Sequence, residues 1–246
     1  MADQPIVFNN AGTSGGVTLI TASDTSDKDG LVEMRVKAGT VPTTVSIKAL
    51  HEKSKVEGFS GGLEVTAAMP IITRFSIAPT KYNIRSFNRI NAETTDIVAR
   101  ISDSAGNSVP DGTIVRFESR EGGSIDTCRT VGGTCASVWT PGGKQSDDGR
   151  VQVMAYVQGV EVFKDNNSNN VFDDGDTFED LPEPFSDDNT NGQYDLGEFF
   201  ADANNNGKRD IEDGKWNGVN CKHSTLCGPA SQLVNLSQQT TLYLSS

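Results

Sequence analysis

Three consecutive stretches of sequence decide the fold. They are Thr95-Asp-Ile-Val-Ala-Arg-Ile-Ser102, Asp103-Ser-Ala-Gly-Asn-Ser-Val-Pro-Asp-Gly112 and Thr113-Ile-Val-Arg-Phe-Glu-Ser119. The two outer runs alternate polar and apolar residues and are rich in Val, Ile and Thr. The middle segment consists almost entirely of residues that favour turns. Alternation with a period of two predicts half-buried strands on either side of a connecting turn.

The same pattern recurs along the chain outside residues 164–228. The expected strands are Gly16–Ile20, Leu31–Lys37, Thr43–Leu50, Leu63–Ala67, Ile71–Ile77, Thr95–Ser102, Thr113–Ser119, Ala136–Thr140, Arg150–Val157, Val160–Phe163, Gln232–Leu236 and Thr240–Leu244. No run predicts a helix of about ten residues or more. Short strands separated by regular turns are typical of β-sandwiches, and 246 residues favour two domains. We therefore expect an all-β protein.

The segment Asp103-Ser-Ala-Gly-Asn-Ser-Val-Pro-Asp-Gly-Thr-Ile-Val-Arg-Phe117 resembles the signature of bacterial immunoglobulin-like domains of the invasin/intimin type. That signature reads Asp-x-x-Gly-Asn-Pro-Val, then Gly, then a Val-x-Phe strand. Ser108 stands where the family usually has Pro. Gly122-Gly-Ser-Ile125 and Asp148-Gly-Arg-Val-Gln-Val-Met-Ala155 are similar to further pieces of the family. The resemblance implies an immunoglobulin-like β-sandwich.

A second match lies upstream and divides the chain. Its pieces resemble the later strands of the same domain type: Val7-Phe8, Gly15-Gly-Val-Thr-Leu19, Asp29-Gly-Leu31, Ala38-Gly-Thr40 and Val45-Ser-Ile-Lys-Ala49. We expect residues 1–69 to form a partial immunoglobulin-like domain without its early strands, and residues 70–246 to form a second domain. A truncated sandwich would expose a sheet edge that could pair with another molecule.

Three twelve-residue segments carry the ligand spacing of the EF-hand calcium loop. Loop one is Asp165–Asp176, loop two is Asp187–Glu198 and loop three is Asp202–Asp213. Each has Asp or Asn at positions 1, 3, 5 and 9, a carboxylate at position 12, and a backbone carbonyl available at position 7. The predicted ligands are Asp165, Asn167, Asn169, Val171, Asp173, Asp176, Asp187, Asn189, Asn191, Gln193, Asp195, Glu198, Asp202, Asn204, Asn206, Lys208, Asp210 and Asp213. We expect about two to four Ca²⁺ ions.

The three loops differ in quality. Loop two has Gly192 at the sharp turn of position 6 and Glu198 at position 12, whereas loop one has Asn170 at position 6. Loop three ends in Asp213, with Glu212 beside it as a substitute. Three further carboxylates between loops one and two are candidates to complete a neighbouring site: Glu179, Asp180 and Glu183.

The loops lack the flanking helices of a calcium sensor. Pro182 and Pro184 follow loop one, and loop three begins soon after loop two ends, so no helix of three turns has room. The segment is similar to the helix-poor calcium loops of secreted proteins, such as thrombospondin type 3 repeats and dockerins, although a dockerin needs a Leu-rich helix after each loop. We therefore favour a structural role for calcium over signalling.

The negative charge of the chain is concentrated in this segment. The formal net charge is −12, and residues 161–213 contain 16 of the 33 acidic residues with only three of the 21 basic ones. Repelling carboxylates would hold the segment open without a cation. The alternative is a solvated acidic linker, but the segment contains aromatic residues that linkers lack. The acidic balance also excludes a nucleic-acid partner.

Four cysteines form two close pairs, Cys128 with Cys135 and Cys221 with Cys227. This spacing suggests two disulfides in an exported protein, and zinc is disfavoured because neither pair is Cys-x-x-Cys. The Cys128–Cys135 hairpin with Trp139 resembles a calcium-insert subset of the family, found in exported proteins of Gram-negative bacteria. We expect a cell-surface, outer-membrane-associated or periplasmic location.

The N-terminus shows no signal peptide, and no run reaches the ~18 apolar residues that would insert into a membrane. We interpret the chain as a fragment of a longer exported protein, with Met1 added for expression.

No catalytic motif is present, and His51 and His223 are the only histidines. Three functions remain: a calcium-stabilised structural or adhesive module of a bacterial surface protein, a carbohydrate- or protein-binding module, or a non-catalytic appendage of a secreted hydrolase. The expected partner is an unidentified protein or carbohydrate at the cell surface. Exposed Trp139 or Trp216 would favour binding, whereas buried ones would favour a spacer.

Overall fold

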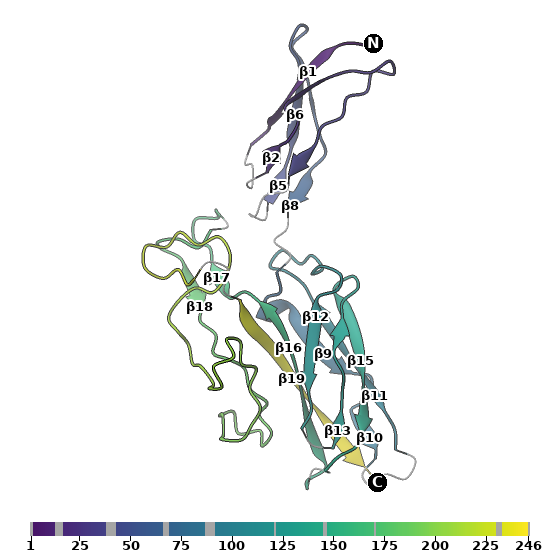
Figure 1. Ribbon diagram of the computed structural model, residues 1–246, viewed down its shortest axis with the longest axis vertical. Coiled ribbons are helices and arrows are strands. Elements are labelled where there is room, and N and C mark those ends of the chain that lie inside the picture. Colours follow the sequence, from purple (N-terminus) through teal and green to yellow (C-terminus); the bar gives the residue numbers. More distant parts are fainter. Residues whose placement is uncertain are drawn as a thin grey trace. The chain divides into compact units, whose positions relative to one another are not determined.

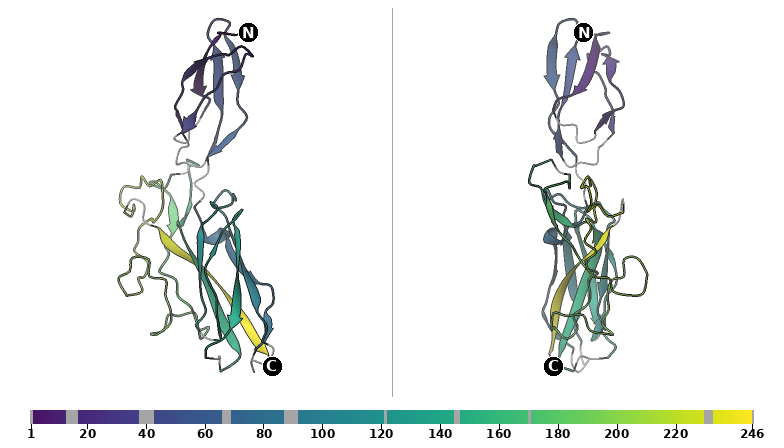
Figure 2. Two further views of the ribbon diagram at one scale, coloured as in Figure 1. Left: turned by 45° about the vertical axis from the view of Figure 1, so that its right-hand side comes forward. Right: turned by 90° about the vertical axis from the view of Figure 1, so that its left-hand side faces the viewer.

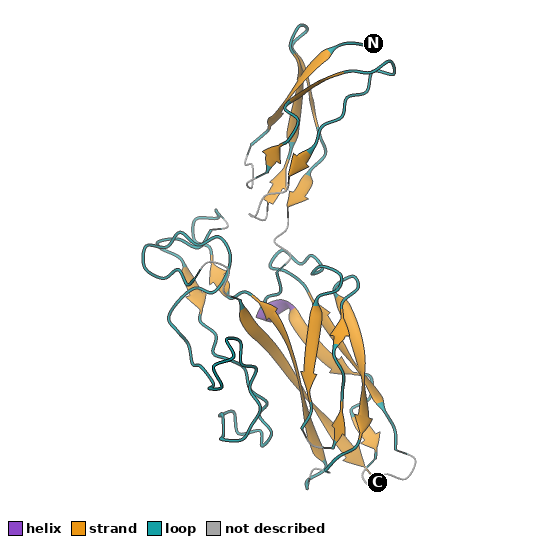
Figure 3. Cartoon of the chain, in the orientation of Figure 1, coloured by secondary structure: helices purple, strands orange, loops and turns teal. Residues whose placement is uncertain are grey.

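The computed structural model describes residues 2–12, 17–37, 43–65, 69–86, 92–120, 122–144, 147–169, 171–229 and 233–245. The chain divides into two compact units, one of residues 1–67 together with 169–171 and the other of residues 68–168 and 172–246 (Figure 1). Strands and loops make up nearly all of the described residues, and one turn of 3-10 helix, η1 (Ile72–Arg74), is the only helical element among them (Figure 3). The prediction of an all-β chain is confirmed.

The second unit is a β-sandwich of two sheets. One sheet has the order β13 (Gly123–Ser124), β15 (Thr134–Pro141), β11 (Thr95–Ile101), β9 (Phe75–Pro79). The other has the order β10 (Asn83–Arg85), β19 (Val234–Ser245), β16 (Arg150–Gly159), β12 (Ile114–Glu118), β14 (Cys128–Arg129). Neighbours are antiparallel except β10 and β19, which are parallel. This strand order is that of an immunoglobulin-like fold, in which β16 and β19 are the last two strands.

Alternation along each strand fills the space between the two sheets. Ile97, Ala99 and Ile101 of β11 are buried, whereas the residues between them are more exposed. Trp139 of β15 is 0% exposed, and its Nε1 donates to Ser119 Oγ at 3.1 Å. Trp139 is therefore a core residue with a satisfied polar atom.

The acidic segment lies between the last two strands of this sandwich. β16 and β19 pair over ten residues, from Arg150 opposite Tyr243 to Gly159 opposite Val234. Between them the chain leaves the sheet and forms a two-stranded hairpin, β17 (Val162–Lys164) with β18 (Thr177–Glu179), and the three loops (Figures 1 and 2). We call residues 161–229 the insert.

The two strands expected at Gln232–Leu236 and Thr240–Leu244 are one continuous strand, β19. The polar residues Ser237 to Gln239 interrupt the hydrophobic pattern. They remain in the strand because the insert covers its outward face and β16 pairs along its length. Gln232 lies outside the described residues.

The first unit contains a four-stranded antiparallel sheet, in the order β3 (Ser23–Thr25), β1 (Pro5–Asn10), β6 (Ile47–His51), β7 (Val56–Phe59). Two ribbons accompany it, β2 (Thr18–Leu19) with β4 (Val36–Lys37) and β5 (Thr43–Val45) with β8 (Leu63–Val65). Phe8, Val17, Val45 and Ile47 form its core. The edge strands β3 and β7 are exposed along their whole length. That this unit lacks early strands and pairs through an edge stays a prediction.

Several strands were not predicted from the sequence. Six of them have only two to four residues: β3, β7, β10, β13, β14 and β18. The longer β1 was indicated only by the family-like pair Val7-Phe8. The strand predicted at Ile71–Ile77 begins instead with η1, and β9 starts at Phe75. The predicted strand ends at residues 16, 66, 67 and 232 lie outside the described residues, as do the family-like residues 15–16 and 38–40.

Candidate calcium-binding insert

The insert is fixed to the outward face of β16 and β19. Gln239 donates its Nε2 to the carbonyl of Phe185 at 2.8 Å and accepts the N–H of Asp187 at 3.2 Å. Asn235, 8% exposed, donates to the carbonyl of Ala201 at 2.9 Å. These side chains leave β19 on the side opposite the sandwich core, because neighbouring residues of a strand point to opposite faces. The insert is thus a packed layer and not a solvated linker.

An aromatic core organises the end of the insert that carries loop one. Phe172 is 0% exposed. Its ring lies 5.8 Å from Phe163, 5.3 Å from Phe178 and 5.2 Å from Trp216, measured between ring centroids. The imidazole of His223 stacks on it at 5.3 Å. Both tryptophans of the chain are therefore buried, since Trp216 is 3% and Trp139 0% exposed.

Both predicted disulfides, Cys128–Cys135 and Cys221–Cys227, are confirmed. Cys221 closes a small ring beside the aromatic core, where Lys222 N–H donates to the carbonyl of Phe172 at 2.8 Å. All four thiols are used, so none remains to bind zinc.

Loop two folds around the carboxylate at its ninth position. Asn189 Nδ2 and Asn191 Nδ2 each lie 2.7 Å from Asp195 Oδ2. Glu198 closes the loop, because its two oxygens accept the backbone N–H of Asp188 at 3.0 Å and of Asp195 at 2.8 Å. The amides of positions 3 and 5 thus meet the carboxylate of position 9, and the carboxylate of position 12 accepts the backbone N–H groups of positions 2 and 9. That these residues bind calcium stays a prediction.

Loop three has the same arrangement with a different closing residue. Asn204 Nδ2 and Asn206 Nδ2 lie 2.6 and 2.8 Å from Asp210 Oδ2. The two oxygens of Glu183 accept the backbone N–H of Ala203 at 2.6 Å and of Asp210 at 3.0 Å. Glu183 therefore takes the place that position 12 fills in loop two.

Loop one is closed by its own twelfth residue. Asp176 accepts the backbone N–H of Asn166 at 2.9 Å and of Asp173 at 3.0 Å. These hydrogen bonds lower the pKa of Asp176 below its usual value, with the Asn166 contribution the largest. Asn167 Nδ2 lies 3.0 Å from Asp173 Oδ1. Asp165 opens the loop directly after β17, and Asn170, at position 6, lies outside the described residues.

The backbone conformation repeats between the loops. Asp187 and Asp202, at position 1, accept the N–H of Gly192 and Gly207, at position 6, at 2.8 and 2.7 Å. These glycines have φ values of 77° and 76°, a conformation that favours glycine. At position 5, Oδ1 accepts the N–H of position 7 at 2.7 Å in all three loops, in the pairs Asn169–Val171, Asn191–Gln193 and Asn206–Lys208. The three segments are one structural motif.

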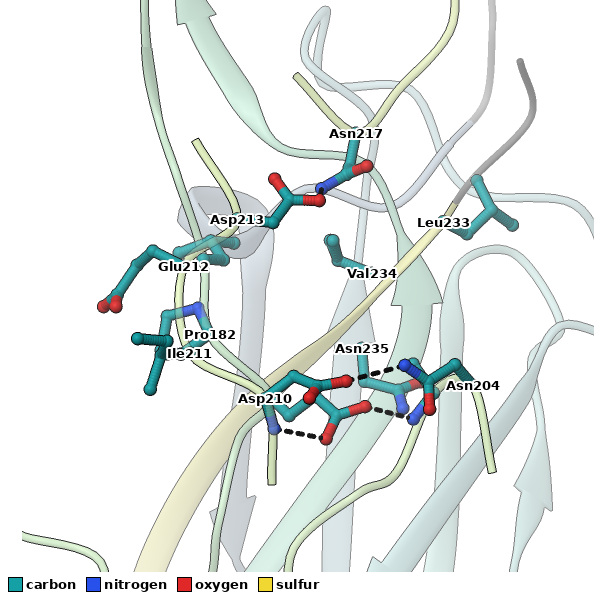
Figure 4. A pocket seen from close by; sticks show the side chains of 13 residues that line it. Pro182, Asn204, Asp210, Ile211, Glu212, Asp213, Asn217, Leu233, Val234 and Asn235 are labelled. Atoms are coloured by element: carbon teal, nitrogen blue, oxygen red, sulfur yellow. Dashed lines mark hydrogen bonds between the residues drawn. The ribbon is translucent and has the colours of Figure 1, made fainter. Parts of the chain in front are cut away.

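The prediction that Asp213 is the twelfth ligand of loop three is corrected by these contacts. Asp213 Oδ1 accepts the N–H of Lys215 at 2.7 Å, and Asn217 Nδ2 donates to Asp213 Oδ2 at 3.3 Å. Figure 4 shows Asp213 directed toward Asn217, while Asp210 and Asn204 meet at the other end of the same pocket, whose volume is about 530 Å³. Asp213 belongs to a different group of side chains.

A missing glycine explains why loop three does not close on itself. Position 11 is Gly175 in loop one and Gly197 in loop two, with φ values of 105° and 107°. Loop three has Glu212 there, and a residue with a Cβ rarely adopts such a conformation. Glu212 is exposed and points away from Asp213 and Asn217 in Figure 4, so it does not substitute either.

Glu161 is a buried carboxylate that sequence reasoning missed. It follows Val160, which comes directly after the end of β16 at Gly159, and it is 1% exposed. Burial raises its pKa to about 7. Hydrogen bonds from the N–H groups of Asn217 and Leu181 oppose this shift, and nearby Asp180 and Asp213 add to it. Its sequence context, Val-Glu-Val, gave no signal of this environment.

The loops present the donor set that calcium prefers. Carboxylates, amides and backbone carbonyls are hard oxygen ligands, and a half-turn of each Asn amide exchanges its Nδ2 for Oδ1 at the loop centre. Among the described residues, no group of three or more His, Cys, Asp or Glu side chains stands at metal-ligating spacing. The loop carboxylates instead accept hydrogen bonds from backbone N–H groups and Asn amides.

The described residues contain no helix long and apolar enough to cross a membrane. The two histidines lie in different units: His51 contacts Ser54 Oγ at 2.6 Å in an exposed turn, and His223 packs on Phe172.

Comparisons with known proteins add little beyond this. No protein-family model and no curated protein matches the chain. The crystal structure of invasin, a bacterial integrin-binding protein, is similar at 16% identity with a TM-score of 0.33, over 64% of this chain and 29% of that one. The D00-D0 domain of intimin is similar at 14% identity with a TM-score of 0.26, over 63% of this chain and 77% of that one. This chain thus spans less than a third of the invasin chain.

Proposed function

We propose that this chain is a calcium-stabilised structural or adhesive module of an exported bacterial surface protein, and that it has no enzymatic activity. The observation that carries the proposal is the repeated loop. In each of the three segments, Asn amides donate to the carboxylate at loop position 9. A second carboxylate closes each loop by accepting hydrogen bonds from two backbone N–H groups. One motif repeated three times in an insert with many acidic residues needs a common ligand, and a divalent cation is the ligand whose charge it matches.

The insert is placed so that ordering it would stiffen the module. It lies between the last two strands and covers the outward side of β19 through Gln239 and Asn235. Binding of Ca²⁺ would remove carboxylate repulsion within this layer and fix it against the sheet. The two disulfides and the immunoglobulin-like strand order support the proposed exported location.

The alternative proposal, a carbohydrate-binding module, has less support. Such sites stack sugars on exposed aromatic rings, whereas Trp139, Trp216 and Phe172 are all buried. A protein partner at the bacterial surface is compatible with the proposal and is not identified by any feature of the insert.

The hydrodynamic radius of the protein tests this proposal. Sedimentation velocity in calcium is expected to give a compact particle, and the chelated protein is expected to sediment more slowly because the insert opens. A magnesium-only sample serves as the control, because Mg²⁺ needs stricter octahedral geometry and holds its waters more tightly. Equal sedimentation coefficients in calcium and in chelator would contradict the proposal.

A further inference from the structure

The buried carboxylate of Glu161 repeats the contact that closes each loop. One of its oxygens accepts the N–H of Leu181 at 2.9 Å and the other accepts the N–H of Asn217 at 2.7 Å. The closing carboxylate of each loop likewise accepts hydrogen bonds from two backbone N–H groups, those of loop positions 2 and 9. Glu161, however, belongs to none of the three loops.

The residues around Glu161 reproduce other parts of the motif. Asp180 precedes Leu181, and its Oδ2 accepts the N–H of Gly214 at 2.6 Å. This matches the contact between position 1 and the glycine of position 6 in loops two and three. Gly214 has a φ of 71°, close to the 77° and 76° of the loop glycines.

Asp213 and Asn217 complete the arrangement. Asp213 Oδ1 accepts the N–H of Lys215 at 2.7 Å, as position 5 does for position 7 in each loop. Asn217 Nδ2 lies 3.3 Å from Asp213 Oδ2 (Figure 4). It also lies 3.3 Å from the carbonyl oxygen of Lys215. Loop positions 1, 5, 6, 7, 9 and 12 are thus matched, in that order, by Asp180, Asp213, Gly214, Lys215, Asn217 and Glu161. These residues come from three separate segments of the chain.

Two oxygens of this group have no hydrogen-bond partner, which is an observation independent of the contacts above. Asn217 is 3% exposed, and its Oδ1 is buried without a donor. Asp180 Oδ1 is likewise buried and unpartnered. A buried oxygen without a donor is costly. A half-turn of the Asn217 amide would place Oδ1 beside the carboxylate of Asp213, where two oxygens need a cation between them.

In the described parts of the chain, no ion pair reaches Glu161, Asp180 or Asp213, so no basic side chain there provides that cation. The nearest lysine in sequence, Lys215, donates its Nζ to the carbonyl of Thr225 at 2.6 Å.

We propose that Glu161, Asp180, Asp213, Asn217 and the carbonyl of Lys215 form a fourth, discontinuous Ca²⁺ site, which we call the base cradle. It deepens the proposed function, because it joins the start of the insert at Glu161 to the later part of the insert at Asn217. The all-oxygen donor set, with an amide and a backbone carbonyl, suits Ca²⁺. The three carboxylates are not yet gathered at ligand distance and would close on the ion.

Calcium stoichiometry tests the base cradle. Bound Ca²⁺ is counted by metal analysis after dialysis for Asp180→Asn and Asp213→Asn, and near-ultraviolet circular dichroism reports whether each variant is folded. The matched controls are Glu179→Gln and Glu212→Gln, which remove a charge from the exposed neighbours of the same two residues. Each test variant is expected to bind one equivalent fewer than its control.

The outcomes separate this proposal from the one on which it rests. A folded Asp180→Asn or Asp213→Asn protein that binds as many ions as its control overturns the base cradle, whatever the three loops bind. Absence of any bound Ca²⁺ in the wild type overturns both proposals. If neither test variant folds, the wild-type count decides: four equivalents support the base cradle, and three or fewer overturn it.

Discussion

Glu183 accepts the backbone N–H of Asp210 at 3.0 Å, across 27 residues of chain. The contact makes Glu183 the closing carboxylate of loop three, although it precedes the loop and lies outside its twelve residues. Loops two and three are therefore coupled, because the chain between Glu183 and Asp210 contains all of loop two.

Glu183→Gln should remove the ion of loop three. The amide keeps the size of the side chain but has only one acceptor oxygen, so one of two N–H groups loses its partner and the ion loses a charge. The variant is expected to bind one Ca²⁺ fewer by metal analysis and to lose about 1–3 kcal/mol of stability. Glu212→Gln, the neighbour of the originally predicted ligand, serves as control. If the control loses the ion and Glu183→Gln keeps it, the assignment is wrong.

Glu198→Gln should remove the ion of loop two by the same reasoning. Its carboxylate accepts the N–H of Asp188 and Asp195 and would supply both oxygens to calcium. Leu196→Asn, in the same loop and 100% exposed, should leave the stoichiometry unchanged. Full calcium binding by folded Glu198→Gln would show that loop two is misassigned.

The hydrogen-bonded form of the loops was predictable from sequence where its residues are local. In loop two, the hydrogen bonds that join positions 1, 3, 5, 9 and 12 to the loop all lie within residues 187–198, and calcium binding by these residues stays a prediction. Loop three was predicted with the wrong closing residue, because the turn at position 11 needs a glycine and the chain has Glu212. Glu183 was one of three candidates to complete a neighbouring site, but the sequence did not assign it to loop three, and Glu161 was not singled out at all. The partners of both residues are distant in the sequence and are brought close only by the folding of the insert.

The strands likewise divide into those with a clear local signal in the sequence and those without one. The strands around Thr95–Ser102 and Thr113–Ser119 were predicted because alternation reports burial on one side. β3 and β14 carry too few apolar residues to give that signal. β19 was split in the prediction because Ser237 to Gln239 are polar, although β16 pairs with all three and Gln239 bonds to Phe185 and Asp187 of the insert.

Phe172→Ala should destabilise the insert. Phe172 is 0% exposed and touches four other rings, so truncation leaves a cavity and should cost about 3–5 kcal/mol. Denaturant unfolding in saturating calcium measures this, with Ile211→Ala, 71% exposed, as control. A loss equal to that of the control would mean that the aromatic core does not support the insert.

Both disulfides should be intact in the purified protein. Thiol titration of the denatured protein is expected to find no free thiol before reduction and four after it. The double variant Cys221→Ser with Cys227→Ser should be less stable by about 2–3 kcal/mol in the chain-entropy model. Detection of free thiols before reduction would count against the exported location.

The central claim is that calcium organises the insert, and thermal unfolding with and without chelator tests it most directly. Each independent site at a hundredfold excess of Ca²⁺ over its dissociation constant contributes about 2.7 kcal/mol. Chelation is therefore expected to lower the Tm by several degrees, and added Ca²⁺ in excess of chelator should restore it. A melting curve that is the same in calcium and in chelator would contradict the account.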